Sequence, residues 1–281
     1  MGNLLTSLLN SGNALQAFNR ALNITENNVE NSQTPGYARQ TATFEALPFD
    51  PAINLPGGVQ AGPAQSSRSA LAEQAVQQQQ SALGFSQQRS TDLNSVQSLF
   101  DLSSQSGVSA TIDGLFSSFS ALSINPNDTT ARQTVISSAQ QLAQAFQTSA
   151  GGLATQGAAV TSEMQGTISS INQLAGRIAQ LNTQRQSENG QGGDAGTDAS
   201  MYADLEQLSQ YGSFTALQQP DGSISVYLDG QTPLVMGNQS FALQGDFSAP
   251  QARVLCSHVN DITSTVSSGE LDAEIETKNS S

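Results

Sequence analysis

The pattern of apolar positions predicts one long amphipathic helix at the start of the chain. From Leu4 to Val29 an apolar stripe advances in alternating steps of four and three residues. Its positions are Leu4, Leu8, Ser11, Leu15, Phe18, Leu22, Thr25 and Val29. A seven-residue repeat of this kind drives helices together side by side. The other face is polar and rich in asparagine, so the helix needs a partner for its single stripe.

The helical pattern ends in the segment Asn-Ser-Gln-Thr-Pro-Gly-Tyr at residues 31–37. Pro35 disfavours helical angles at Thr34, and the Pro-Gly pair favours a type II turn with Gly36 at positive φ. Residues 39–44 alternate as an extended segment does. Residues 48–66 are rich in proline and glycine, which predicts a linker.

A second helical region is predicted over residues 67–211. Its most regular stripe follows Gly151-Gly152 and again alternates steps of four and three. The positions are Val160, Met164, Thr167, Ile171, Leu174, Ile178 and Leu181. Shorter stripes lie at 93–100, 112–122 and 135–146, with Asn127 or Asp128 as the cap of the last. Neighbouring helices with one stripe each predict an antiparallel rod-like bundle held together by those stripes.

The period changes to two after residue 212. Ile224, Val226 and Leu228 alternate with polar positions between Asp221-Gly222 and Asp229-Gly230, which are hairpin signals. Residues 234–236 and 241–243 are candidates for further short strands. Beyond residue 261 no apolar periodicity remains, so a disordered polar end is predicted.

These elements divide the chain into five regions and set the fold class. The regions are 1–47 (helix and turn), 48–66 (linker), 67–211 (helical rod domain), 212–260 (partial β region) and 261–281 (polar end). The predicted fold is mainly α, with a long N-terminal amphipathic helix, an elongated antiparallel helical bundle, and a small β-hairpin region near 212–245.

Charge narrows the choice of partners. The net charge is −14, with nine basic residues among 281, and these are scattered singly. Binding to nucleic acid or to an anionic membrane surface needs clustered Lys and Arg, so neither is expected. No run of eighteen apolar residues predicts a transmembrane helix, and the N-terminus lacks the basic region of a cleaved signal peptide. Only 11% of residues are charged, and an uncharged polar surface suits lateral packing of copies.

Candidate catalytic or metal-binding groups are few. Cys256 is the only cysteine and His258 the only histidine, whereas a metal site needs three or four ligands. Cys256 is therefore expected to be a buried thiol. One histidine without a scaffold around it does not predict a catalytic triad. Asp194, Asp198 and Asp204 are expected to be solvated in a polar loop. We predict no enzyme activity, no cofactor and no metal.

One motif resembles a known family. The heptad helix is followed by Asn27-Asn28-Val29-Glu30-Asn31 and then by residues 34–40, Thr-Pro-Gly-Tyr-Ala-Arg-Gln. This order is similar to the N-terminal signature of bacterial flagellar axial proteins, namely rod, hook and hook-associated proteins. The continuation through Arg39 and Gln40 resembles the hook-associated protein 1 family, as does the helix start at 125–146. The motif residues are Asn27, Asn28, Asn31, Thr34, Pro35, Gly36, Tyr37, Arg39 and Gln40.

The resemblance implies a structural subunit at the junction between hook and filament. Such subunits are exported unfolded by the flagellar type III apparatus without leader cleavage and act outside the cell. The implied partners are copies of the chain, neighbouring hook and hook-associated proteins, and an export chaperone that binds the C-terminus. The implied assembly seam is Leu4, Leu8, Leu15, Phe18, Leu22 and Val29. Pro35, Gly36 and Tyr37 would set the turn that leads into the rod domain.

Two expectations concern the end of the chain and the competing functions. Family members continue to a second helix that pairs with the first, and residues after Gly269 do not resemble it, so a C-terminal truncation with poor assembly is expected. The alternatives are a rod or hook subunit, a secreted coiled-coil binding module or effector with a flagellar-type export helix, and a non-assembling fragment. The long helical region from 67 to 185 counts against a rod or hook subunit.

Overall fold

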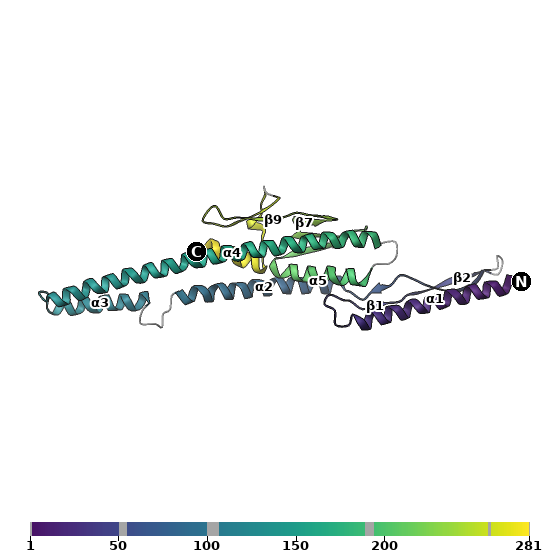
Figure 1. The fold of residues 1–281 in the computed structure, drawn as a ribbon, viewed down its shortest axis with the longest axis horizontal. Coiled ribbons are helices and arrows are strands. Elements are labelled where there is room, and N and C mark those ends of the chain that lie inside the picture. The colour runs from purple at the N-terminus through teal and green to yellow at the C-terminus, as the bar shows by residue number, and fades with distance from the viewer. Residues whose placement is uncertain (1, 51–54, 100–106, 189–193, 258–259, 281) are drawn as a thin grey trace. The chain divides into compact units, whose positions relative to one another are not determined.

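The computed structural model describes residues 2–50, 55–99, 107–188, 194–257 and 260–280 (Figure 1). The helices are α1 (Gly2–Glu30), α2 (Ala70–Leu99), α3 (Val108–Ile124), α4 (Thr129–Glu188), α5 (Ala195–Tyr211), the 3-10 turn η1 (Thr263–Thr265) and α6 (Gly269–Ser280). The strands are β1 (Gln40–Thr41), β2 (Phe44–Asp50), β3 (Leu55–Ala61), β4 (Gln65–Ser66), β5 (Phe214–Gln218), β6 (Ile224–Leu228), β7 (Thr232–Met236), β8 (Gln239–Ser240), β9 (Leu243–Asp246), β10 (Arg253–Cys256) and β11 (Asn260–Asp261). The predicted class, mainly α with small antiparallel sheets, is confirmed.

The chain forms two compact units, each built from two separate stretches. The first unit is Met1–Gln80 with Ile171–Ala242, and the second is Ser81–Ser170 with Leu243–Ser281. The five predicted regions are continuous in sequence, so their boundaries do not describe this arrangement. As functional divisions they stay a prediction.

In the first unit, the segment predicted as a linker contains an antiparallel hairpin, and that prediction is wrong for much of residues 48–66. β2 pairs with β3 from Phe44↔Ala61 to Asp50↔Leu55. A two-stranded hairpin has two free edges, so a proline can turn its missing N–H outward without breaking the ladder. Gly57 and Gly58 take positive φ values, of 65° and 143°. At Gly58 a Cβ would overlap the Asn10 side chain, which shows how closely β3 approaches α1.

The rest of the first unit packs helices against a four-stranded sheet of order β5-β6-β7-β8. The turn between β6 and β7 has Asp229 and Gly230 at φ values of 49° and 69°, the pattern of a type I′ hairpin turn. This confirms the predicted Asp-Gly turn. Asn182 on α4 is fully buried, accepts the Ile224 N–H at 2.8 Å, and donates to the carbonyls of Ile224 and Gly237. One side chain thus joins α4 to the strands, because each of its polar groups has a backbone partner.

In the second unit, α4 runs through Gly151-Gly152 without a break. Its start is capped as predicted, and Asp128 is the cap, because its carboxylate accepts the N–H groups of Thr130 and Ala131. The two glycines do not end the helix. At Gly152 a Cβ would lie 2.8 Å from a Leu99 methyl, so the missing side chain lets α2 approach.

The predicted disordered end, 261–281, is also wrong over most of its length. The end of β11 and all of η1 and α6 lie within it, and Leu271, Ala273 and Ile275 of α6 are buried. Asn279 accepts the Ala252 N–H at 2.7 Å, and Lys278 donates to the Gly157 carbonyl at 3.0 Å. A helix of twelve residues with four carboxylates shows no clear stripe, so tertiary packing rather than periodicity determines it.

Candidate assembly site on the N-terminal helix

The predicted apolar seam of α1 is open to solvent. Leu8, Leu15, Phe18, Leu22 and Val29 are each 60–70% exposed. Leu4 completes the seam in sequence, and its side chain lies outside the described part of the chain. Leu9, one position away, is also exposed. Contiguous exposed apolar surface of this kind makes the seam a candidate interaction site.

A neighbouring stripe of three alanines and one isoleucine on the same helix is covered. Ala14, Ala21 and Ile24 are half-buried and Ala17 is 1% exposed, in the same alternating steps of three and four. The β2–β3 hairpin lies along this stripe, and the rings of Phe18 and Phe44 approach to 5.9 Å between centroids. Small side chains let a strand come close to a helix. Part of α1 is therefore covered within the chain, whereas the large seam residues remain exposed.

Sequence reasoning missed this covered stripe because it followed only large apolar residues. The signal was present as alanines at heptad spacing, next to a proline- and glycine-rich segment that could form a hairpin.

The motif asparagines form a hydrogen-bonded turn at the base of α1. The Tyr37 hydroxyl donates to Asn28 Oδ1 at 2.8 Å or to Asn27 Oδ1 at 3.0 Å. Asn28 Oδ1 also accepts the Gln40 N–H, and its Nδ2 donates to the Gln40 carbonyl, both at 2.8 Å. Asn28 therefore pairs with the Gln40 backbone as a neighbouring strand would. Burial raises the pKa of Tyr37, so its hydroxyl keeps its proton in this network.

Asn31 and Thr34 extend the same turn. Asn31 Nδ2 donates to the Asn27 carbonyl at 3.0 Å, and the Thr34 hydroxyl donates to Asn31 Oδ1 at 3.1 Å. The Tyr37 N–H donates to the Thr34 carbonyl at 3.1 Å, and Gly36 has φ of 73°. This is the predicted turn with Pro35 and Gly36 at its centre. The asparagine side chains thus make these bonds within the turn.

Gly36 also lets the turn pack closely against α5. A Cβ there would overlap the Ala199 carbonyl oxygen and lie 2.9 Å from the Ala203 nitrogen. Arg68 donates to the Gly36 carbonyl, and its guanidinium carbon lies 3.7 Å from the centre of the Tyr202 ring. The Arg39 carbonyl accepts the Ser67 N–H at 2.9 Å, where β1 pairs with β4. Arg68, Tyr202 and Ala199 were not predicted, since nothing in a single sequence connects them to Gly36.

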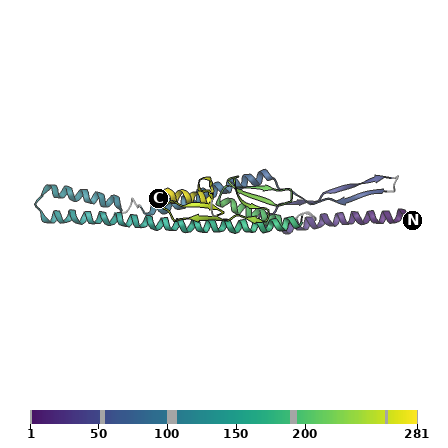
Figure 2. The same cartoon turned by 90° about the horizontal axis from the view of Figure 1, so that it is seen from above.

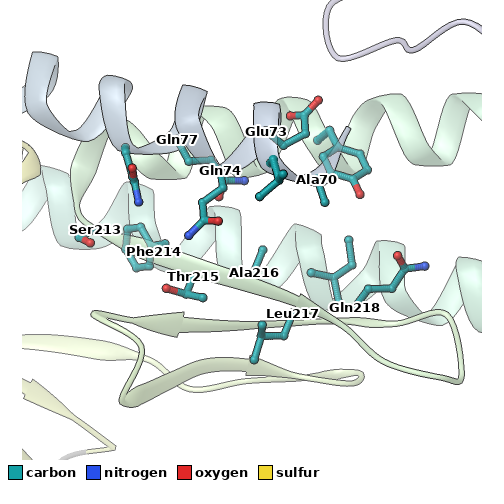
Figure 3. Close-up of a pocket in the computed structure, with 14 residues that line it drawn as sticks. Ala70, Glu73, Gln74, Gln77, Ser213, Phe214, Thr215, Ala216, Leu217 and Gln218 are labelled. Atoms are coloured by element: carbon teal, nitrogen blue, oxygen red, sulfur yellow. The ribbon is translucent and has the colours of Figure 1, made fainter. Parts of the chain in front are cut away.

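A pocket of the first unit lies between the start of α2 and the edge strand β5 (Figure 3). Glutamines 74 and 77 and residues Phe214–Gln218 line it, and its carboxylate, Glu73, is paired with Arg68. Nowhere in the described chain do three or more His, Cys, Asp or Glu side chains gather as metal ligands would. Over the same residues, no helix is both long and apolar enough to span a bilayer.

The three aspartates predicted to be solvated have structural roles instead. Asp194 caps α5 by accepting the N–H groups of Gly196 and Thr197 at 3.3 Å. Asp198 pairs with Arg185, and Asp204 pairs with Arg177 at 2.7 Å. Cys256 is buried as predicted, and His258 lies outside the described residues.

Comparisons with known proteins agree with the motif. Residues 93–281 match the family model described as the flagellar hook-associated protein FlgK helical domain. Flagellar hook-associated protein 1 of Salmonella typhimurium is 25% identical over 256 residues, 90% of this chain and 45% of that protein. Its counterpart in Bacillus subtilis is 26% identical over 180 residues, 61% of this chain and 36% of that protein.

One solved structure shares the fold. The flagellar hook junction protein FlgK from Burkholderia pseudomallei superposes with a TM-score of 0.60 at 24% identity, over 73% of this chain and 38% of that one. The chain spans less than half the length of these curated relatives and of this structure. The family match covers about two thirds of the chain, and the protein therefore belongs to the FlgK family of flagellar hook-associated proteins.

Proposed function

We propose that the chain acts in a structural subunit at the hook–filament junction of the bacterial flagellum, and that the exposed seam of α1 is its assembly surface. The observation that carries this is the seam itself, five large apolar side chains that are each 60–70% exposed. Burying one such side chain contributes about 1.5–3 kcal/mol. Covering the seam in an assembly would therefore yield roughly 10 kcal/mol per subunit, before the cost of ordering α1.

The motif turn holds the base of α1 in a fixed direction. Asn28 binds the Gln40 backbone on both sides, and Gly36 fits against α5 with no room for a side chain. A fixed base means that a partner at the seam meets a helix already oriented, which reduces the ordering cost of association. In this proposal the seam residues supply the affinity for a partner, and the motif residues fix the direction of α1. The motif residues are Asn27, Asn28, Asn31, Thr34, Pro35, Gly36, Tyr37, Arg39 and Gln40.

The remaining parts of the proposal follow from family membership. The subunit would be exported by the flagellar type III apparatus without leader cleavage, and it would act outside the cell. Its partners would be copies of itself and neighbouring hook and hook-associated proteins, with a chaperone during export. Its role is structural rather than enzymatic.

The test replaces seam residues in the gene that encodes this chain. Leu15→Ser with Leu22→Ser should abolish filament attachment while the subunit is still exported into the medium. The matched control is Asn13→Ser with Asn19→Ser, two exposed polar positions of the same helix. Normal filaments with the seam variant would overturn the proposal. Loss of secretion would show instead that the seam serves export, which favours an export helix on a binding module.

A further inference from the structure

A second exposed apolar surface lies on the α3–α4 hairpin of the second unit. In both views α3 runs antiparallel beside the first part of α4 (Figures 1 and 2). Several large apolar side chains of this hairpin are exposed, and four of them are Phe116, Phe119, Phe146 and Leu153, at 36–68%. We call these four residues the hairpin face.

Helix geometry places the four residues on one side of the hairpin. The covered stripe of α3 includes Leu115 and Ser118, and that of α4 includes Ala145 and Gly152. Each residue of the hairpin face directly follows one of these positions, so it lies about 100° further round its helix in the same sense. Because the two helices are antiparallel, that same sense of rotation turns Phe116, Phe119 and Phe146 toward one face of the pair. Leu153 lies on the same side of α4, seven residues after Phe146, where Gly152 packs against Leu99 of α2.

The charge distribution decides which partner this face suits. The hairpin and its continuation, residues 107–162, contain Asp113, Asp128 and Arg132 as their only charged residues, whereas the whole chain carries −14. Residues 133–162 contain no charge at all. Two copies of a strongly acidic chain repel each other over most of their surfaces, but along this stretch they meet without bringing like charges together.

We propose that the hairpin face binds the α3–α4 hairpin of a second copy of this chain. A bilayer surface is disfavoured because a single arginine supplies no attraction to anionic lipid. An unlike protein would usually be selected by complementary charge, which this face lacks. An apolar, uncharged face is complementary to itself.

The size of the face sets the strength of the contact. α3 has 17 residues, so the hairpin offers a surface about 25 Å long and two helix diameters, about 20 Å, wide. That is about 500 Å² per copy and about 1,000 Å² in total, the lower limit for a specific contact. Copies would associate weakly in dilute solution and firmly once an assembly holds them together.

The inference rests on the proposed function only in that copies of the chain assemble, and the experiment separates the two. Sedimentation velocity is measured from about 10 µM to about 1 mM in the Leu15→Ser/Leu22→Ser background, which removes the α1 seam. The sedimentation coefficient should still rise with concentration. Adding Phe116→Ser and Phe146→Ser should weaken this association at least tenfold, whereas Leu71→Ser with Leu217→Ser, also exposed apolar residues, should leave it unchanged.

Circular dichroism of each variant checks that helix content is retained. Two results would overturn the inference: monomers throughout in the seam-variant background, or unchanged association after the phenylalanine substitutions. Binding of the hairpin face to a different flagellar protein, with no self-association, would also overturn it. None of these outcomes bears on filament attachment through the α1 seam.

Discussion

Two heptad stripes in this chain have the same spacing, but one is buried and the other is exposed. On α4, Val160, Met164, Ile171, Leu174 and Ile178 are at most 2% exposed. On α1, the matching positions are 60–70% exposed. Spacing alone therefore identifies which face of a helix is apolar, but it does not tell whether the partner is in the same chain.

The polar positions of the two stripes differ in the same way. Thr167 sits inside the α4 stripe, is buried, and donates to Glu274 Oε1 at 2.9 Å. Thr25 occupies the corresponding kind of position on α1, is exposed, and donates to the Ala21 carbonyl of its own helix at 2.9 Å. A polar residue in a covered stripe must find a partner, whereas one in an open stripe can use water.

The largest expected effect comes from shortening a side chain of the covered stripe on α4. Ile178→Ala should lower the free energy of unfolding by about 2–5 kcal/mol, because it leaves a cavity in a closely packed core. Urea denaturation followed by circular dichroism measures this change. Leu22→Ala on α1 is the matched control, and a comparable loss there would mean that the seam is covered within the monomer.

A pH effect of a few kcal/mol is expected at Glu274. Burial, together with the nearby Glu270, Glu163 and Asp92, raises the pKa of Glu274 to about 8. The hydrogen bond from Thr167 acts in the opposite direction and lowers this pKa. The folded state thus holds a proton that the unfolded chain releases near pH 4.5. Stability from this group is fully present below that pH and is lost as the pH rises through about 8.

Glu274→Gln should remove most of this pH dependence. Urea denaturation at several pH values between 4.5 and 9 provides the measurement. The pKa of Glu163 is also raised by burial and by Asp92, so a small slope should remain in the variant. An unchanged slope would show that Glu274 is not the group responsible.

A smaller effect is expected where the turn fixes α1. Tyr37→Phe removes a hydroxyl that bonds the side chains of Asn27 and Asn28, which should cost about 1 kcal/mol. Amide hydrogen exchange at Gln40 should become faster, because that N–H is bound to Asn28 Oδ1. Unchanged exchange at Gln40 would mean that Asn28 holds the strand without help from Tyr37.

The sequence predicted local structure well wherever neighbouring residues determine it. The Pro-Gly turn, the Asp128 cap and the Asp229-Gly230 hairpin turn depend on backbone preferences of a few residues, and all three are present. The β2–β3 hairpin and α6 were missed because contacts between distant segments stabilise them. Asn279 with Ala252, and Gly58 with Asn10, are separated by 27 and 48 positions.

In the candidate site, too, the sequence predicted the local features and missed those that depend on contacts between distant segments. The asparagine and Tyr37 positions could be named from the motif, but their bonding within the turn could not, since it depends on how the chain folds back to Gln40. The exposure of the seam was expected from its lack of a partner helix. The alanine stripe beside it was not, because its partner is a hairpin within a segment whose prolines and glycines had predicted a linker.

The smallest expected effect is the most telling for the comparison between the two stripes. Leu15→Ser should change the free energy of unfolding of the isolated chain by less than about 0.5 kcal/mol, because the side chain is already in water in the folded state. Thermal unfolding of the monomer checks this, and concentration must stay low enough to avoid self-association. The same substitution should weaken assembly, where the side chain becomes buried. If a substitution leaves the stability of the monomer unchanged but weakens the assembly, the residue has its partner in another chain. Ile178→Ala, in contrast, should destabilise both the monomer and the assembly.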